Sequence, residues 1–207
     1  EGARVFRERH PGVPDVTVPW GIPPTGLPEA RTAARPDGAP LRFVHVAGWG
    51  GLNNRKNTDA LIRAWHKAAP QNAVLVLYTQ APPGKYGEDC ERILRQDASI
   101  ELHGGTVDNI FEAYADADML LWPSKREGLG LPIVEALACG LPVLISDGYM
   151  MKQWIIPGEH GVVCPAEPRE SIQYLPEMRV DETALAAMIA DLAAHPERIA
   201  QMAENVR

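Results

Sequence analysis

The chain has 207 residues, of which 45% are hydrophobic and 23% are charged, as in an ordinary globular protein. Its 20 Lys and Arg residues against 27 Asp and Glu residues give a net charge of −7. That balance argues against nucleic acid as a partner, because affinity for a phosphate backbone comes from clustered Lys and Arg. The three cysteines are far apart in the sequence, which excludes a disulfide framework and predicts a reducing, cytoplasmic location.

The first 40 residues differ in composition from the rest. They contain eight of the 19 prolines, and only Val16-Thr17-Val18 has strand character. Proline fixes φ and removes an amide donor, so residues 1–40 are predicted to form an extended arm or interdomain linker, followed by one domain over 41–207. The chain begins with Glu1 rather than Met, which predicts that it starts partway through a longer protein.

From Leu41 onward, short apolar runs alternate with amphipathic stretches. The runs cover residues 43–47, 73–78, 99–103, 119–122, 142–145 and 161–164. Most are apolar at successive positions, which is typical of parallel strands covered on both faces. The alternation predicts an α/β fold with an open parallel sheet, and ligands of such sheets bind beyond the carboxyl ends of the strands.

The stretches between the runs are predicted to be helices. The expected ranges are 58–69, 86–96, 107–116, a helix with Pro132 at its first position, a helix after Asp181 and a short one after His195-Pro196. Asn57 and Asp181 are the predicted N-caps, because short polar side chains bind the first free amides of a helix.

A glycine-rich turn with two cations follows the first apolar run. It reads Gly48-Trp49-Gly50-Gly51-Leu52-Asn53-Asn54-Arg55-Lys56-Asn57 and leads directly into a predicted helix. Glycines let the backbone approach a ligand, and a helix start attracts anions. The turn is either a phosphate-binding site or a flexible surface loop with two solvated cations. It matches neither a Walker A loop nor a dinucleotide fingerprint, so this segment alone does not decide.

A second turn, after the fourth run, carries two carboxylates. Glu127 precedes two glycines, and Glu135 lies in the first turns of the next helix. The amides of Gly128 through Leu131 are expected to be unpaired donors at the helix start, which makes a cradle for a diphosphate. A carboxylate accepts hydrogen bonds only, so each glutamate can take two donors from the vicinal hydroxyls of a sugar or a ribose.

Each carboxylate also has a structural interpretation. An acid in the first turns of a helix is favoured by the helix dipole, by about 0.3–1 kcal/mol. Glu127 can instead form a surface ion pair with Lys125 or Arg126. The combination favours function, because seven residues separate the two glutamates across a Gly-x-Gly-x-Pro turn that follows a buried strand.

Residues 123–147, PSKREGLGLPIVEALACGLPVLISD, resemble the Glu-x7-Glu motif of retaining glycosyltransferases with the GT-B fold, of the group 1 or family 4 type. Three further stretches are similar to that family: IELHGGTVDNIFEAYADADMLLWPS, VPWGIPP and HGVVCPAE. The resemblance covers about residues 15–205.

The resemblance implies a two-domain, metal-independent enzyme whose Rossmann-like halves face a cleft. The C-terminal half binds a nucleoside-diphosphate sugar, and the N-terminal half binds the hydroxyl acceptor. This chain resembles the C-terminal half only, so its expected partners are the nucleotide-sugar and the missing acceptor domain. No resident cofactor is expected.

Carried over residue by residue, the resemblance implies these roles. Lys56 holds the donor phosphates and, with Glu127, serves catalysis, while Glu127 faces the hydroxyls of the transferred sugar. Gly128, Leu129, Gly130 and Leu131 form the backbone cradle, and Glu135 binds the ribose hydroxyls. Thr106 and Val107 form the turn whose backbone touches the base.

The sequence departs from the family pattern at two places. The family has an arginine directly after the first glycine of its Gly-Arg-x4-Lys turn, where this chain has Trp49-Gly50. Arg55, beside the lysine, either replaces that arginine or belongs to a rearranged loop. The second strand runs into Tyr78-Thr79-Gln80 instead of a Gly-x-Gly ending. This departure leaves open whether the chain prefers the same base and sugar as the family.

Three other function classes compete with this interpretation. An epimerase of the same architecture stays a rival, whereas a phosphorylase would need a pyridoxal-phosphate lysine in a context that is not visible. A non-catalytic module of the response-regulator or flavodoxin kind would need an acidic cluster after the first strand, where this chain has glycines and cations.

The six histidines lack ligand spacing, so no metal site is expected, and His45 is predicted to be a core or strand-end residue. Phe6, Arg7 and Arg9 can contact either the missing half or, through peripheral association, a membrane surface.

Overall fold

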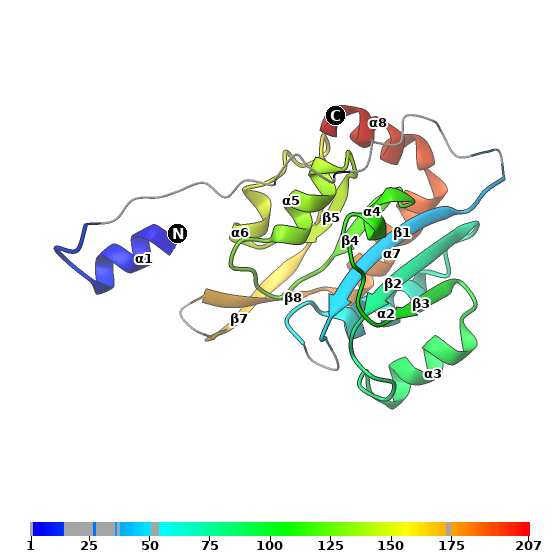
Figure 1. Ribbon diagram of the computed structural model, residues 1–207, viewed down its shortest axis with the longest axis horizontal. Coiled ribbons are helices and arrows are strands. Elements are labelled where there is room, and N and C mark those ends of the chain that lie inside the picture. The colour runs from blue at the N-terminus through cyan, green and yellow to red at the C-terminus, as the bar shows by residue number, and fades with distance from the viewer. Residues whose placement is uncertain (1, 15–26, 28–35, 37, 51–53, 173–174) are drawn as a thin grey trace.

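The computed structural model describes residues 2–14, 27, 36, 38–50, 54–172 and 175–207. Six parallel strands form one sheet in the order β3-β2-β1-β4-β5-β6 (Figure 1). They are β1 (Leu41–Gly48), β2 (Ala73–Thr79), β3 (Ile100–Gly104), β4 (Met119–Trp122), β5 (Val143–Ser146) and β6 (Gly161–Cys164). The strand order reverses between β1 and β4, which is the point where sheets of this kind bind ligands. The predicted open parallel sheet is confirmed.

Helices cover both faces of this sheet (Figure 1). One face packs against α2 (Thr58–Ala68), α3 (Glu88–Gln96), α7 (Glu182–Ala194) and α8 (Pro196–Val206). The other packs against α4 (Glu112–Ala115), α5 (Leu131–Ala138) and α6 (Tyr149–Lys152). Neighbouring residues of β1 serve the two cores: Phe43 lies in the first and Val44 in the second, and both are fully buried. This double burial is why the strands are apolar at successive positions.

The two predicted N-caps have different outcomes. The Asp181 carboxylate accepts hydrogen bonds from the amides of Thr183 (2.8 Å) and Ala184 (3.1 Å), so that cap is confirmed. Asn57 precedes α2 in a left-handed conformation (φ 61°) and its side chain makes no capping bond, so the predicted cap is wrong. The residue turns the chain from the glycine-rich loop into α2 instead.

Three further segments differ from the sequence-based expectation. Residues 107–116 contain only the four-residue α4, because the Asn109 side chain accepts from the Phe111 amide (3.1 Å) and holds a turn before the helix. Within the arm, Gly2–Arg9 is the helix α1 rather than extended chain, with an ion pair between Arg4 and Glu8 one turn apart. The strand character of residues 16–18 lies outside the described residues.

An antiparallel hairpin, β7 (Ala166–Ile172) and β8 (Leu175–Val180), was not predicted. Its sequence carries prolines and charges that hide the strand pattern. Tertiary contacts hold it: the Met178 amide donates to the Lys125 carbonyl (2.7 Å), and Arg126 pairs with Glu177 (3.1 Å). The hairpin thus supports the turn that contains Glu127.

Candidate functional site

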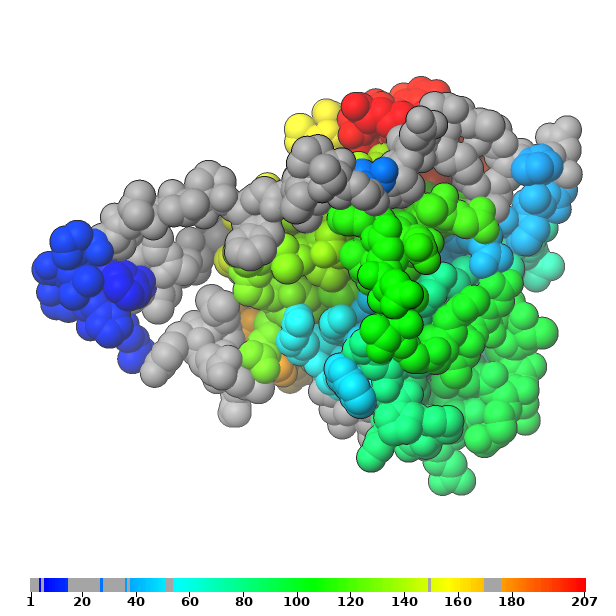
Figure 2. Space-filling view, in the orientation of Figure 1, coloured from blue at the N-terminus to red at the C-terminus, as the bar shows by residue number. Residues whose placement is uncertain are grey.

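A cavity of about 630 Å³ opens at the carboxyl ends of the strands, at the point where the strand order reverses. Its walls come from the segments after β1, β2, β3 and β4 and from the start of α5, which meet on the face shown in Figure 2. All ten residues predicted from the sequence line it: Arg55, Lys56, Thr106, Val107, Glu127, Gly128, Leu129, Gly130, Leu131 and Glu135. The structure therefore brings together residues that are up to 80 positions apart in the chain.

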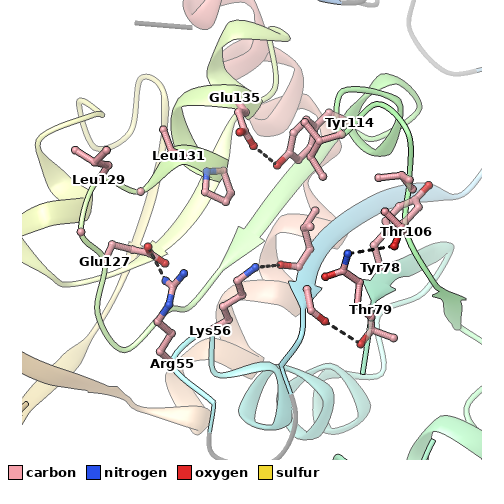
Figure 3. A pocket seen from close by; sticks show the side chains of 18 of the residues that line it. Arg55, Lys56, Tyr78, Thr79, Thr106, Tyr114, Glu127, Leu129, Leu131 and Glu135 are labelled. Carbon is pink, nitrogen blue, oxygen red and sulfur yellow. Dashed lines mark hydrogen bonds and ion pairs between the residues drawn. The ribbon is translucent and has the colours of Figure 1, made fainter. Parts of the chain in front are cut away.

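Lys56 lies in the wall formed by the glycine-rich turn. Its Nζ donates to the carbonyl of Val46 (3.0 Å) and lies 5.1 Å from the centre of the Trp122 ring. Gly48 makes this placement possible, since it has a φ of 58° and a side chain there would begin 3.0 Å from Lys56 Nζ. In the view of Figure 3, Lys56 lies between the Arg55–Glu127 pair and the wall that carries Thr106.

The charge of Lys56 is balanced by its neighbours. Burial lowers the pKa of its ammonium group most, and the adjacent Arg55 guanidinium lowers it further. The carboxylates of Glu127 and Glu135 act in the opposite direction and favour the charged form. An incoming anion would add to their effect and strengthen the charged form of this lysine.

The turn before α5 presents backbone to the cavity. Gly130 has a φ of 73°, and its carbonyl accepts from the amide of Ile133 (2.9 Å), which begins the helix. The carbonyl of Leu129 accepts from Trp154 Nε1 (2.7 Å), and this bond fixes the outer side of the turn. Pro132 is the second helical residue, one place later than predicted. Amides at such a helix start have no partner inside the helix and favour an anion.

Glu127 is nearly buried, with 4% of its side chain exposed. Its Oε2 accepts from Arg55 Nη1 (2.7 Å), and its Oε1 accepts from Trp122 Nε1 (3.0 Å). Ser124 Oγ also lies 2.8 Å from Oε1. The alternative of a surface ion pair with Lys125 or Arg126 is wrong, because Glu127 is nearly buried and its partner is Arg55 from the neighbouring turn after β1.

Glu135 is held by a residue that the sequence did not single out. The hydroxyl of Tyr114, a buried residue of α4, donates to Glu135 Oε2 (3.1 Å). Burial raises the pKa of the Glu135 carboxyl, while the Tyr114 hydrogen bond and the charge of Lys56 oppose that rise. Glu135 therefore has a fixed oxygen on the Tyr114 side and faces the cavity with Lys56 nearby.

Thr106 and Val107 lie in the turn after β3, and Figure 3 shows Thr106 on the opposite wall from Glu127. Thr106 Oγ1 accepts from Gln80 Nε2 (3.4 Å), and the amide of Gly105 donates to the carbonyl of Thr79 (2.9 Å). These contacts join the ends of β2 and β3. Tyr78, Thr79 and Gln80 line the cavity as well, and their place at the carboxyl end of β2 was the signal that could have marked them.

Within the described ranges, no group of three His, Cys, Asp or Glu side chains could hold a metal ion. His45 is fully buried, with Nδ1 2.7 Å from the carbonyl of Leu121 and Nε2 2.9 Å from Thr58 Oγ1. Burial lowers its pKa to about 3, so the ring is neutral at pH 7. It is a core residue, as predicted.

Fold and cavity together define a Rossmann-like α/β domain with its site at the carboxyl edge of the sheet. The family model described as glycosyl transferases group 1 matches residues 43–195. The chain belongs to this family.

Curated relatives and solved structures agree with that assignment. The D-inositol 3-phosphate glycosyltransferase of Rhodococcus opacus is 28% identical over 201 residues, which are 88% of this chain and 44% of the relative. The lipopolysaccharide core biosynthesis mannosyltransferase LpcC of Rhizobium leguminosarum is 25% identical over 77% of this chain and 48% of its own length. This chain thus spans less than half the length of these relatives.

The fold is that of the GT-B glycosyltransferases. The C-terminal domain of a group 1 family glycosyltransferase, LpcC, from Francisella tularensis superposes with a TM-score of 0.63 at 20% identity, over 81% of this chain and 84% of that one. Sucrose-phosphate synthase from Thermosynechococcus elongatus gives a TM-score of 0.69 at 23% identity, over 99% of this chain and 50% of that one. Of the helices that the structure describes, none combines the length and the apolar character needed to cross a membrane.

Proposed function

We propose that this chain is the donor-binding half of a retaining glycosyltransferase and that it holds a nucleoside-diphosphate sugar in the cavity at the end of its sheet. One observation carries the proposal. Two cations, two carboxylates and the start of α5 face the same cavity. A diphosphate, a ribose and a sugar need that combination of groups.

We assign each part of the donor to one group of residues in the cavity. The diphosphate would lie between Lys56, with Arg55 beside it, and the amides of Gly128 through Leu131. The ribose diol would bind Glu135, and the transferred sugar would bind Glu127. The base would lie against the turn of Thr106 and Val107, on the opposite wall.

Chemistry at the sugar requires the diphosphate to leave with additional negative charge. Preorganised donors that stabilise such charge commonly make a large contribution to catalysis. Lys56, Arg55 and the turn amides can supply this stabilisation from the protein itself, so we propose a metal-independent reaction. In the whole protein, the sugar would pass to a hydroxyl acceptor on the other domain with retention at the anomeric carbon. Turnover that disappears with a chelator and returns with a divalent cation would overturn metal independence.

Calorimetric titration tests donor binding. The chain is titrated with UDP, GDP and ADP and with UDP-glucose, GDP-mannose and ADP-glucose. We expect one nucleoside diphosphate and its sugar ester to bind, and no sugar transfer by the 207-residue chain alone. Absence of binding by every ligand of the panel would overturn the proposal, and robust turnover would overturn the assignment to a donor half.

Location and peripheral contacts complete the proposal. All three cysteines are free and buried, which supports a reducing compartment, the cytoplasm. Phe6 of α1 is 41% exposed on a short helix with arginines around it, so α1 would contact either the acceptor domain or an anionic membrane surface. Cosedimentation of the chain with anionic lipid vesicles separates these two partners.

A further inference from the structure

The carboxylate of Glu127 is oriented from beneath the cavity. Trp122 Nε1 donates to Oε1 (3.0 Å), whereas Oε2 faces the half-exposed Arg55 (2.7 Å). Ser124 Oγ also approaches Oε1 (2.8 Å), but the same hydroxyl lies 2.9 Å from the Arg55 carbonyl and 3.0 Å from the Arg126 carbonyl. One hydroxyl proton cannot serve three acceptors. The Trp122 N–H points at Oε1, whereas the Ser124 hydroxyl has three candidate acceptors, so we assign the orientation of Oε1 to Trp122.

The same indole also touches the lysine of the site. Lys56 Nζ lies 5.1 Å from the ring centre of Trp122, within the range of a cation–π contact. The His45 ring is a further neighbour, with its centre 5.4 Å from that of Trp122. His45 is neutral at pH 7, so it places no second positive charge beside the ring that attracts Lys56. Trp122 itself is fully buried at the end of β4.

We propose that Trp122 is a positioning residue for the donor: its N–H sets the direction of the Glu127 carboxylate, and its ring face helps to seat the Lys56 ammonium. The inference rests on the proposed function, because it assigns Glu127 to the sugar and Lys56 to the diphosphate. With Oε1 held by Trp122, we assign the sugar hydroxyls to Oε2, the oxygen that Arg55 contacts. A carboxylate held in one orientation loses less freedom when the sugar binds.

The two contacts of Trp122 can be separated by substitution. Trp122→Phe keeps a ring face for Lys56 but removes the N–H that binds Glu127. We expect this variant to bind the nucleoside diphosphate within about twofold of wild type and to lose about tenfold in affinity for the matching nucleotide-sugar, the scale of a hydrogen bond to a charged group. The probes are the diphosphate and sugar ester that bind most tightly among the UDP, GDP and ADP pairs.

A matched control is available in the same core. Trp65 is also fully buried, and its Nε1 donates to Ser99 Oγ (2.9 Å) on the far side of the sheet. Trp65→Phe removes a comparable hydrogen bond and lowers stability without altering the ratio of the two affinities. In a Glu127→Ala background, Trp122→Phe should change that ratio no further, because its effect passes through the carboxylate.

Three outcomes overturn the positioning role while the proposed function stands. They are an unchanged affinity ratio in Trp122→Phe, an equal change in Trp65→Phe, or a further change of the ratio in the Glu127→Ala background. If Trp122→Phe does not fold, benzothienylalanine at position 122 decides, since it keeps the bicyclic ring and replaces only the N–H with sulfur, and it should lower sugar-donor affinity selectively. Wild-type protein that binds neither ligand overturns the proposed function and this inference with it.

Discussion

The guanidinium of Arg55 and the carboxylate of Glu127 form an ion pair of 2.7 Å between residues 72 positions apart. Arg55 is 47% exposed and Glu127 only 4%, so a half-exposed cation covers a buried anion at the edge of the cavity. A diphosphate that enters the cavity would compete with Glu127 for Arg55. Arg55 can move toward the phosphate only by releasing Glu127 Oε2, the oxygen that we assign to the sugar.

This arrangement predicts unequal effects of the two cations. Lys56→Ala should weaken nucleoside-diphosphate binding by about 1.5–3 kcal/mol, the scale of a hydrogen bond to a charged group. Arg55→Ala should weaken it less, because Arg55 must first give up its pair with Glu127. Calorimetry on both variants measures the difference. Lys67→Ala, an exposed lysine on α2 that donates to Thr183 Oγ1, is the control. Unchanged binding by Lys56→Ala together with a loss in Arg55→Ala would transfer the phosphate role to Arg55.

Substitutions of the two glutamates should have different effects on the two ligands. Glu135→Ala should weaken the diphosphate and the nucleotide-sugar alike, because both carry the ribose. Glu127→Ala should leave the affinity for the diphosphate unchanged and lower the affinity for the nucleotide-sugar. Glu127→Gln should lower turnover in the whole enzyme, because the sugar is no longer oriented at the reacting carbon. Titration of both variants with both ligands provides the check. If Glu127→Ala loses affinity equally for both ligands, the assignment of the ribose to Glu135 and the sugar to Glu127 is wrong, even though the family is right.

Much of the sheet could be predicted from the sequence because it depends on local patterns. Apolar runs that are buried on both faces mark each strand, and Asp181 marks the start of α7 by its own side chain. The hairpin β7–β8 depends instead on tertiary contacts such as Arg126 with Glu177, which leave no local pattern. Helix α4 is short because Asn109 captures a backbone amide, an effect that periodicity does not report.

The site could be predicted as a set of residues but not as a set of contacts. The rule that ligands bind beyond the strand ends, with the family resemblance that added Thr106 and Val107, predicted ten residues that all line one cavity. The partners of those residues come from other elements: Tyr114 from α4 for Glu135, and Arg55 from the first turn for Glu127. Such pairs depend on how segments far apart in the sequence pack together, and motif spacing carries no information about that packing.

The cradle before α5 can be tested with two glycines. Gly130 has a φ of 73°, and a side chain there would begin 3.3 Å from Ile133 Cδ1, so Gly130→Ala should strain the turn by about 1 kcal/mol or more and weaken diphosphate binding. Gly104→Ala, at the end of β3 and outside the cavity lining, is the control, because no atom lies within 4 Å of the added carbon. Thermal melts and calorimetry of both variants report the result. Equal behaviour of the two variants would show that the backbone at Gly130 does not shape the site.

The Asp181 cap offers a test of stability away from the cavity. Asp181→Ala should lower the free energy of unfolding by about 0.5–2 kcal/mol, because the amides of Thr183 and Ala184 lose their acceptor. Asp181→Asn keeps a capping oxygen and should stay close to wild type. Chemical denaturation measures both values. A loss of the same size in Asp181→Asn would assign the effect to charge rather than to the cap.

His45 predicts how stability depends on pH. Its pKa is lowered from 6.5 to about 3 by burial, so between pH 6.5 and 3 the ring is protonated in the unfolded chain and neutral in the folded chain. The contribution of His45 is therefore fully present above pH 6.5 and declines as the pH falls toward 3, by up to about 1.4 kcal/mol per pH unit. His45→Gln removes this titration while it keeps groups able to bind the Leu121 carbonyl and Thr58. The free energy of unfolding of wild type minus that of the variant should be constant from pH 8 to about 6.5 and should fall below it. A difference that stays constant down to pH 4.5 would mean that the buried ring accepts a proton in the folded state, and with it a positive charge beside Trp122 and Lys56.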